Sequence, residues 1–213
     1  PDHVKSLVNL GRVLLELDGP RDALRHVRRA LEQAPDDPDV RRVAGNVQVD
    51  LGHPWQAVAR YREALTLDGS DAWAANNFGL VLLREGRYRD ALGPLARAVE
   101  LEPGQPVFRN NLGAALERTG RPVAAAEAYR AAAEAGHEKA RVSLARVEEV
   151  GVPEEADPGT PEIETLARRF AGDVRSWGPE PATALGPPPG DSVPGEASPG
   201  GDPSPTGDDD DRP

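Results

Sequence analysis

Five asparagines recur at a fixed interval along the chain, and their carboxamides are the side chains best suited to chemistry. Asn77 and Asn111 lie one interval apart, Asn9 lies two intervals before Asn77, and Asn76 and Asn110 directly precede the last two of these three. A carboxamide offers one acceptor oxygen and two donor hydrogens, so it bonds both polar groups of a peptide backbone without reading its sequence. A ladder of such groups is suited to holding an extended polypeptide.

Catalytic and metal-binding chemistry has no support in the sequence. The chain has no cysteine, and its four histidines, His3, His26, His53 and His137, are scattered without paired spacing. It has no nucleophile-elbow, phosphate-loop or dinucleotide-binding motif, and the aspartate run near the C-terminus lacks the spaced ligands of a calcium loop. We therefore predict no enzyme activity, no cofactor and no metal site.

The distribution of charge and apolar residues argues against nucleic acid and membrane as partners. The formal net charge is −11, and eight acids stand against one base, Arg212, after residue 178. A protein that binds a nucleic-acid duplex carries a basic stripe, which this chain lacks. No apolar run approaches the roughly 20 residues that span a bilayer, so we predict no membrane insertion.

The elements that position the asparagines follow from an internal repeat. Glycine recurs at the same constant interval as the asparagines, and two alanines follow each glycine at fixed distances. Small side chains at such positions let two helices approach closely, and Pro or Gly at the end of each unit stops the second helix. Because aromatic residues are only 4% of the chain, alanine, leucine and valine must build the core, which predicts an all-α protein. The repeated glycines are Gly11, Gly45, Gly79 and Gly113.

This pattern resembles the tetratricopeptide-repeat (TPR) family, whose unit of about 34 residues carries the same order of leucine-glycine, alanine, aromatic, alanine and proline. The resemblance covers residues 4–139 and implies an all-α, right-handed α-solenoid of four helix–turn–helix repeats. We place the repeats at about 4–37, 38–71, 72–105 and 106–139. A helix at 138–150, with Leu144, Val147 and Val150 at helical spacing, is predicted to cap the array, which spans 1–151.

The resemblance also implies which residues face a ligand. In the family, the first helix of each repeat lines an inner groove, and its second, fifth, sixth, ninth, twelfth and thirteenth residues make most ligand contacts. Counted from residue 4, the sixth position holds Asn9, Asn77 and Asn111, and the fifth holds Asn76 and Asn110. This arrangement resembles the asparagine ladder of TPR proteins that hold extended peptides, such as the TPR region of O-linked N-acetylglucosamine transferase. The alternative is that asparagine caps or solvates the helix locally at these positions.

Five cations and one tryptophan complete the candidate groove residues. The cations would attract an acidic peptide by long-range steering, or would form ordinary solvated helix surface. Trp73 has two open interpretations: an exposed anchor for a partner, or packing against the preceding repeat. The cations are Lys5, Arg12, Arg42, Arg84 and Arg118.

The residues beyond the array form a different kind of segment. Residues 179–213 contain ten prolines and six glycines with few apolar groups, so we expect this acidic tail to be disordered. We interpret residues 152–178 as a linker that carries a short amphipathic helix at 161–177. One hypothesis is that this helix docks into the groove or onto the cap helix and competes with partners. Its apolar stripe is Ile163, Leu166, Phe170, Val174 and Trp177.

We predict a non-catalytic scaffold that binds an extended peptide in the groove. The resemblance to TPR proteins of high-GC bacterial genomes implies a multiprotein assembly of pilus, secretion or envelope type. Pro1 lies one repeat interval before Pro35, in the repeat-end position, so we expect further repeats or another domain upstream. The alternative function is therefore the substrate-presenting segment of a larger enzyme. The compartment stays open between cytoplasmic, which we favour, and periplasmic or envelope-associated, if an N-terminal signal has been removed.

Overall fold

The computed structural model describes residues 2–150 and 163–177, and these residues form helices and turns without any strand. The prediction of an all-α repeat solenoid is confirmed. The predicted disordered tail and residues 152–162 and 178 of the predicted linker lie outside the described residues. The helices are α1 (Asp2–Glu16), α2 (Pro20–Gln33), α3 (Pro38–Asp50), α4 (Pro54–Leu67), α5 (Ala72–Arg84), α6 (Tyr88–Leu101), α7 (Pro106–Arg118), α8 (Pro122–Glu134), α9 (Glu138–Val150) and α10 (Ile163–Ser176).

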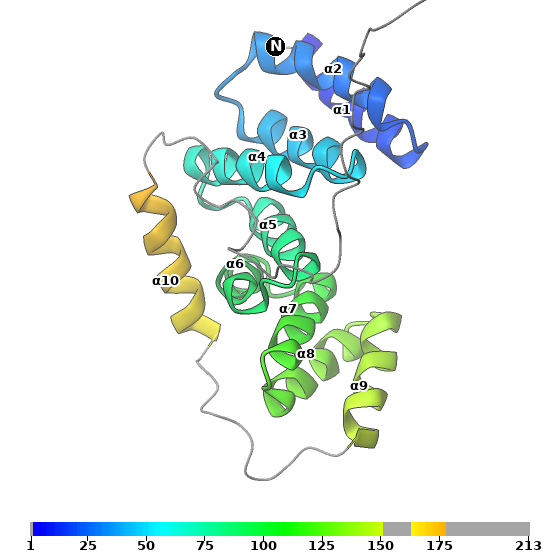
Figure 1. Ribbon diagram of the computed structural model, residues 1–213, viewed down its shortest axis with the longest axis vertical. Coiled ribbons are helices and arrows are strands. Elements are labelled where there is room, and N and C mark those ends of the chain that lie inside the picture. Colours follow the sequence, from blue (N-terminus) through cyan, green and yellow to red (C-terminus); the bar gives the residue numbers. More distant parts are fainter. Residues whose placement is uncertain (1, 151–162, 178–213) are drawn as a thin grey trace, which may run out of the picture.

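Helices α1 to α9 form an array in which each helix packs against the next one (Figure 1). Connections of three or four residues join them, so neighbouring helices run antiparallel. Contacts are more extensive within the pairs α1–α2, α3–α4, α5–α6 and α7–α8 than between pairs. Each pair is one repeat, and we refer to its odd-numbered helix as the first and its even-numbered helix as the second.

Local sequence sets where the helices begin and end. Proline occupies the first turn of five helices, where its missing N–H removes no helical hydrogen bond. Asp37 caps α3 by accepting from the Asp39 N–H at 2.9 Å, and Asp71 caps α5 by accepting from the Ala74 N–H at 2.9 Å. Gly52 ends α3 with a φ of +75°, a left-handed conformation that favours glycine.

The repeated glycines lie where the two helices of a repeat touch. A Cβ atom on Gly45 would lie 2.4 Å from Cε1 of Tyr61, and one on Gly79 would lie 2.6 Å from Cγ of Leu95. The first and fourth repeats make the equivalent contact at 2.8 Å. The missing side chain therefore lets a bulky residue of the second helix lie directly on the backbone of the first.

The apolar core divides in two within the second repeat. Buried residues of α1, α2 and α3 form one cluster, and those of α4 to α10 form the other. Tyr61 of α4 stands at the junction, because its ring lies on Gly45 of α3 and its hydroxyl donates to Asn46 Oδ1 at 2.8 Å. This side chain, together with Val49 of α3, which packs against the second cluster, joins the N-terminal part of the core to the rest.

Helix α10 packs against α6 and α4, the second helices of two successive repeats (Figure 1). Phe170 and Val174 of α10 are buried in this contact. Gly93 of α6 allows the close approach, because a Cβ atom there would lie 3.1 Å from Cβ of Phe170. One hypothesis was that α10 docks into the groove or onto α9. The helix does dock on the array, but the surface that it contacts is that of α6 and α4. The apolar stripe covers a surface formed by Gly93, Pro94 and the ring of Phe78, which belongs neither to the groove nor to α9.

Candidate functional site

The first helices of successive repeats line one face of the array. Helix α1 contacts α3, α3 contacts α5, and α5 contacts α7, whereas successive second helices make no comparable contact within the described residues. The array therefore curves with its first helices on the inner side. Two hollows open on this inner face, one of about 500 Å³ and one of about 470 Å³.

We call these two hollows together the groove. Hollow 1 lies over α1, α3 and α5, and its polar lining residues are Arg12, Glu16, Asn46, Asp50, Tyr61, Asn77 and Arg84. Hollow 2 lies over α5, α7 and α9, and its polar lining residues are Arg84, Tyr88, Glu117, Arg118, Tyr129, Ser143 and Arg146. Arg84 lines both hollows, so the two adjoin at this residue.

Four of the predicted asparagines form a hydrogen-bonded chain across α7 and α5. Asn110 Nδ2 donates to Asn111 Oδ1 at 3.4 Å, Asn111 Nδ2 donates to Asn76 Oδ1 at 2.9 Å, and Asn76 Nδ2 donates to Asn77 Oδ1 at 3.0 Å. Asn76 and Asn111 are buried, with 3% and 8% of their surface exposed. Their carboxamides bond other asparagines rather than solvent, so they link α5 to α7 within the array.

The chain of carboxamides ends on a residue that the sequence analysis missed. Asn77 Nδ2 donates to Asn46 Oδ1 at 3.0 Å, and this oxygen also accepts from the Tyr61 hydroxyl. Asn46 occupies the ninth position of the second repeat, which the family resemblance had already marked as a ligand position. The same count would have found it. The same count could not have found Tyr61, because the family's ligand positions lie on first helices and Tyr61 lies on a second helix.

Replacing Asn76 by alanine is expected to lower the free energy of unfolding by about 1–3 kcal/mol, because a buried donor on Asn111 and an acceptor on Asn77 lose their partner. Urea unfolding followed by circular dichroism measures this effect. Asn9→Ala is the matched control, because Asn9 is exposed and should change stability by less than about 0.5 kcal/mol. If the two substitutions lower the free energy of unfolding equally, the buried chain of asparagines does not contribute to stability.

Arg12 and Arg42 belong to an ion-pair network that runs from α1 through α3 to Asp71, the residue that caps α5. Asp39 pairs with both arginines, and Arg42 Nε also donates to Asp71 at 2.9 Å. The side chains of Arg42 and Asp71 are only 19% and 13% exposed, so this pair lies between the repeats and not in the groove. Arg12 does line hollow 1, but its charge is already neutralised by Asp39.

Hollow 2 holds one ion pair and two further arginines. Arg146 Nη2 donates to Glu117 at 2.8 Å, and this hydrogen bond is the main reason that the pKa of Glu117 lies below its ordinary value. Arg118 lies over the ring of Tyr88, 4.5 Å from its centroid, and donates to its hydroxyl. Arg84 and Arg118 have no carboxylate within ion-pair distance among the described residues.

The remaining predicted residues lie outside both hollows. Lys5 and Asn9 are exposed on α1, where Asn9 Oδ1 accepts from Arg12 at 3.1 Å. Trp73 packs edge-on against Phe108 of α7 with ring centroids 4.9 Å apart, and 39% of its surface stays exposed. One of the two interpretations of Trp73 was packing against the preceding repeat. The ring contact that Trp73 makes is instead with the following repeat.

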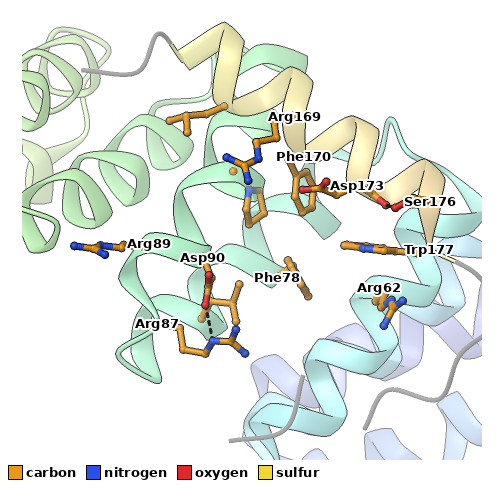
Figure 2. A pocket seen from close by; sticks show the side chains of 14 residues that line it. Arg62, Phe78, Arg87, Arg89, Asp90, Arg169, Phe170, Asp173, Ser176 and Trp177 are labelled. Atoms are coloured by element: carbon orange, nitrogen blue, oxygen red, sulfur yellow. Dashed lines mark hydrogen bonds and ion pairs between the residues drawn. The ribbon is translucent and has the colours of Figure 1, made fainter. Parts of the chain in front are cut away.

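A further hollow of about 520 Å³ lies where α10 meets α6, and Figure 2 shows its lining. The rings of Phe78, Phe170 and Trp177 have centroids 5.6 to 6.0 Å apart, and the Arg62 guanidinium lies 5.0 Å from the Trp177 ring. These contacts hold α10 on the array. The apolar stripe predicted the helix, but its partner surface was not visible in the sequence.

The part of the chain that the structure describes shows neither a metal-binding cluster nor a membrane-spanning helix. Within residues 2–150 and 163–177, no group of three or more His, Asp or Glu side chains is arranged to hold a metal ion. None of the helices described is both long and apolar enough to cross a membrane.

A curved array of helix pairs with a groove along its first helices defines the class of helical-repeat scaffolds for protein–protein interaction. A family model described as tetratricopeptide repeat matches residues 8–52, 42–106 and 76–140. The chain therefore belongs to the tetratricopeptide repeat family. No curated protein matches its sequence.

Several solved structures share the fold. PilF of Pseudomonas aeruginosa is 23% identical with a TM-score of 0.66, covering 82% of this chain and 76% of that one. MamA of Desulfovibrio magneticus is 22% identical with a TM-score of 0.63, covering 83% and 95%. An O-GlcNAc transferase variant of Thermobaculum terrenum is 24% identical with a TM-score of 0.59, covering 62% and 26%. At these identities the similarity shows the fold alone.

Proposed function

We propose that this chain is a non-catalytic scaffold that binds an extended polypeptide segment in its groove, within a larger protein assembly. The observation that carries the proposal is the orientation of Asn46 on the lining of hollow 1. Its Oδ1 already accepts hydrogen bonds from Tyr61 and Asn77, so these two donors fix the carboxamide. Its Nδ2 group makes no hydrogen bond within the described residues and is left to donate to a ligand.

An extended segment suits this arrangement because its backbone carbonyls have no partner of their own. A fixed carboxamide donor bonds such a carbonyl whatever the side chain beside it. Arg84 offers a charged donor at the point where the two hollows meet. Together these groups recognise a backbone and a charge, which is how a scaffold holds an unfolded segment of a partner.

The alternative, a substrate-presenting segment of a larger enzyme, gains no support from these observations. The similar O-GlcNAc transferase is matched over only 26% of its length, and the likeness extends to the repeat fold. The polar residues that line the two hollows offer hydrogen bonds and charge, as a binding site for a polypeptide requires. We therefore keep the non-catalytic scaffold as the proposal.

The test uses the full chain as bait in a lysate of the source organism, with Asn46→Asp and Arg84→Ala as variants. Asn46→Asp keeps the oxygen that accepts from Tyr61 and Asn77 but removes the donor to the ligand. We expect both variants to lose the same partner, and a synthetic peptide from that partner to bind the wild-type chain at least tenfold more tightly than either variant.

The matched control is Asn9→Asp, which makes the same chemical change on α1 outside both hollows. Circular dichroism must show that all variants keep their helix content. If Asn9→Asp loses the partner as well, or if neither groove variant loses it, the groove is not the binding site.

A further inference from the structure

The groove carries opposite charges at its two ends. We propose that it fits an extended segment whose basic residues lie over the first two repeats and whose acidic residues lie over the last two. This inference rests on the proposed function and adds the chemistry and the orientation of the bound segment.

One repeat position sets this polarity. The thirteenth residue of the four repeats is Glu16, Asp50, Arg84 and Arg118 in turn, each one repeat interval after the one before. Each ends or nearly ends a first helix, and all four side chains are exposed. The same place on the solenoid therefore changes from acid to arginine between the second and third repeats.

The structure brings these four residues onto the groove. Glu16, Asp50 and Arg84 line hollow 1, and Arg84 and Arg118 line hollow 2. Although Asp50 is exposed, the partial desolvation of its carboxyl raises its pKa, and Asp18 adds to this rise. Arg84 is near enough that its charge opposes the rise in the pKa of Asp50. The change of sign therefore falls inside the groove, between α3 and α5.

The other charges that line the groove are neutralised within the protein. Arg12 is paired with Asp39 beside hollow 1, and Arg146 is paired with Glu117 in hollow 2. Asp18, whose charge contributes to the raised pKa of Asp50, adds to the acidic side. The charges left without an ion-pair partner among the described groove residues are thus acidic over the first two repeats and basic over the last two.

This polarity determines both partner and orientation. A uniformly acidic or basic segment is attracted at one end and repelled at the other, whereas a segment with segregated charges is attracted at both ends. A carboxamide such as that of Asn46 bonds a backbone running in either direction. The terminal charges therefore decide which end of the segment lies over which repeat.

Four synthetic peptides of equal length, each long enough to span the groove, test the inference against the full chain by fluorescence anisotropy. The segregated peptide has lysines at one end and glutamates at the other, and its isomer carries the same residues in alternation. The lysine peptide carries lysine as its only charged residue, and the glutamate peptide carries glutamate as its only charged residue. We expect the segregated peptide to bind about tenfold more tightly than its isomer in low salt. The difference should largely disappear at about 0.5 M salt, because exposed charges are screened.

A photo-crosslinker at either end of the segregated peptide tests the orientation. The glutamate end should label residues 72–139, and the lysine end should label residues 4–71. Glu16→Arg with Asp50→Arg makes the groove basic throughout, so the glutamate peptide should then bind best. Asp22→Arg with Glu127→Arg is the control, because it changes the net charge equally on exposed positions of second helices.

The outcomes separate this inference from the proposed function. If peptides bind but the segregated one has no advantage, or if its two ends label both halves equally, the polarity is overturned and the groove function stands. If no peptide binds at any salt concentration, both proposals fail together. The polarity is supported if the segregated peptide keeps its advantage in the control variant and the glutamate peptide binds best in the groove variant.

Discussion

Replacing Phe170 by alanine is expected to release α10 from the array. The Phe170 ring is 6% exposed and lies within 6.0 Å of the rings of Phe78 and Trp177. Removing a buried phenylalanine ring costs about 3–5 kcal/mol, because the transfer energy is lost and a cavity remains. An isolated helix of 14 residues is marginal in water, so an undocked α10 should also lose its helical hydrogen bonds.

Hydrogen exchange with mass spectrometry measures this result directly. Amides of 163–176 should exchange much faster in Phe170→Ala, while those of α5 and α7 keep their protection. Gly93→Leu should disrupt the same contact from the α6 side. Even a Cβ atom on Gly93 would lie 3.1 Å from Phe170 Cβ, so a leucine side chain has no room there. Arg168→Ala is the control, since that side chain is 68% exposed. Unchanged protection of α10 in both contact variants would contradict the docking described above.

Replacing Gly45 by alanine is expected to destabilise the array at the junction of its two cores. The new Cβ atom would lie 2.4 Å from Cε1 of Tyr61, a rigid ring that is 1% exposed and bonded to Asn46. Overpacking typically costs about 1–3 kcal/mol, and alanine recovers about 1 kcal/mol of helix propensity. Because the new atom would meet a rigid ring at 2.4 Å, we expect a cost in the upper part of that range, which leaves a net loss of about 1–2 kcal/mol in the free energy of unfolding.

Urea unfolding monitored by circular dichroism tests this prediction, with hydrogen exchange to locate the effect. The loss of protection should extend through α1 to α3 first, because Tyr61 joins their core to that of α4 to α10. Gly104→Ala is the matched control: a Cβ atom there meets nothing within 4 Å, so its stability should stay the same or rise slightly. If Gly45→Ala is as stable as this control, the close helix contact is not what the repeated glycine provides.

Much of the fold follows from the sequence because its signals are local or periodic. The constant spacing of glycine and alanine predicts helix pairs that pack in the same way in every repeat, and the stripe from Ile163 to Trp177 predicts an amphipathic helix. Both are properties of one helix or one repeat. The all-α repeat solenoid was therefore predictable, and it is confirmed.

The candidate site was only partly visible, because it depends on contacts between repeats. The sequence placed asparagines on the first helices, but only the crossing of α3, α5 and α7 decides that Asn76 and Asn111 are buried against each other while Asn46 and Asn77 line hollow 1. In the same way, Arg42 was predicted as a groove cation, but its guanidinium forms ion pairs with Asp39 and with Asp71, the residue that caps α5. Side-chain burial and pairing across helices are not encoded in any single repeat.

The sequence by itself determined the repeat, its helices and the positions at which charge and carboxamides recur, since each depends on residue type and spacing alone. Only the tertiary structure decided which of these side chains share a surface. It directed α10 onto α4 and α6, because a stripe of apolar residues specifies that a helix must be buried but not where. It also brought Asp50 and Arg84 together in one groove, because the curvature that joins their helices arises from packing along the whole array.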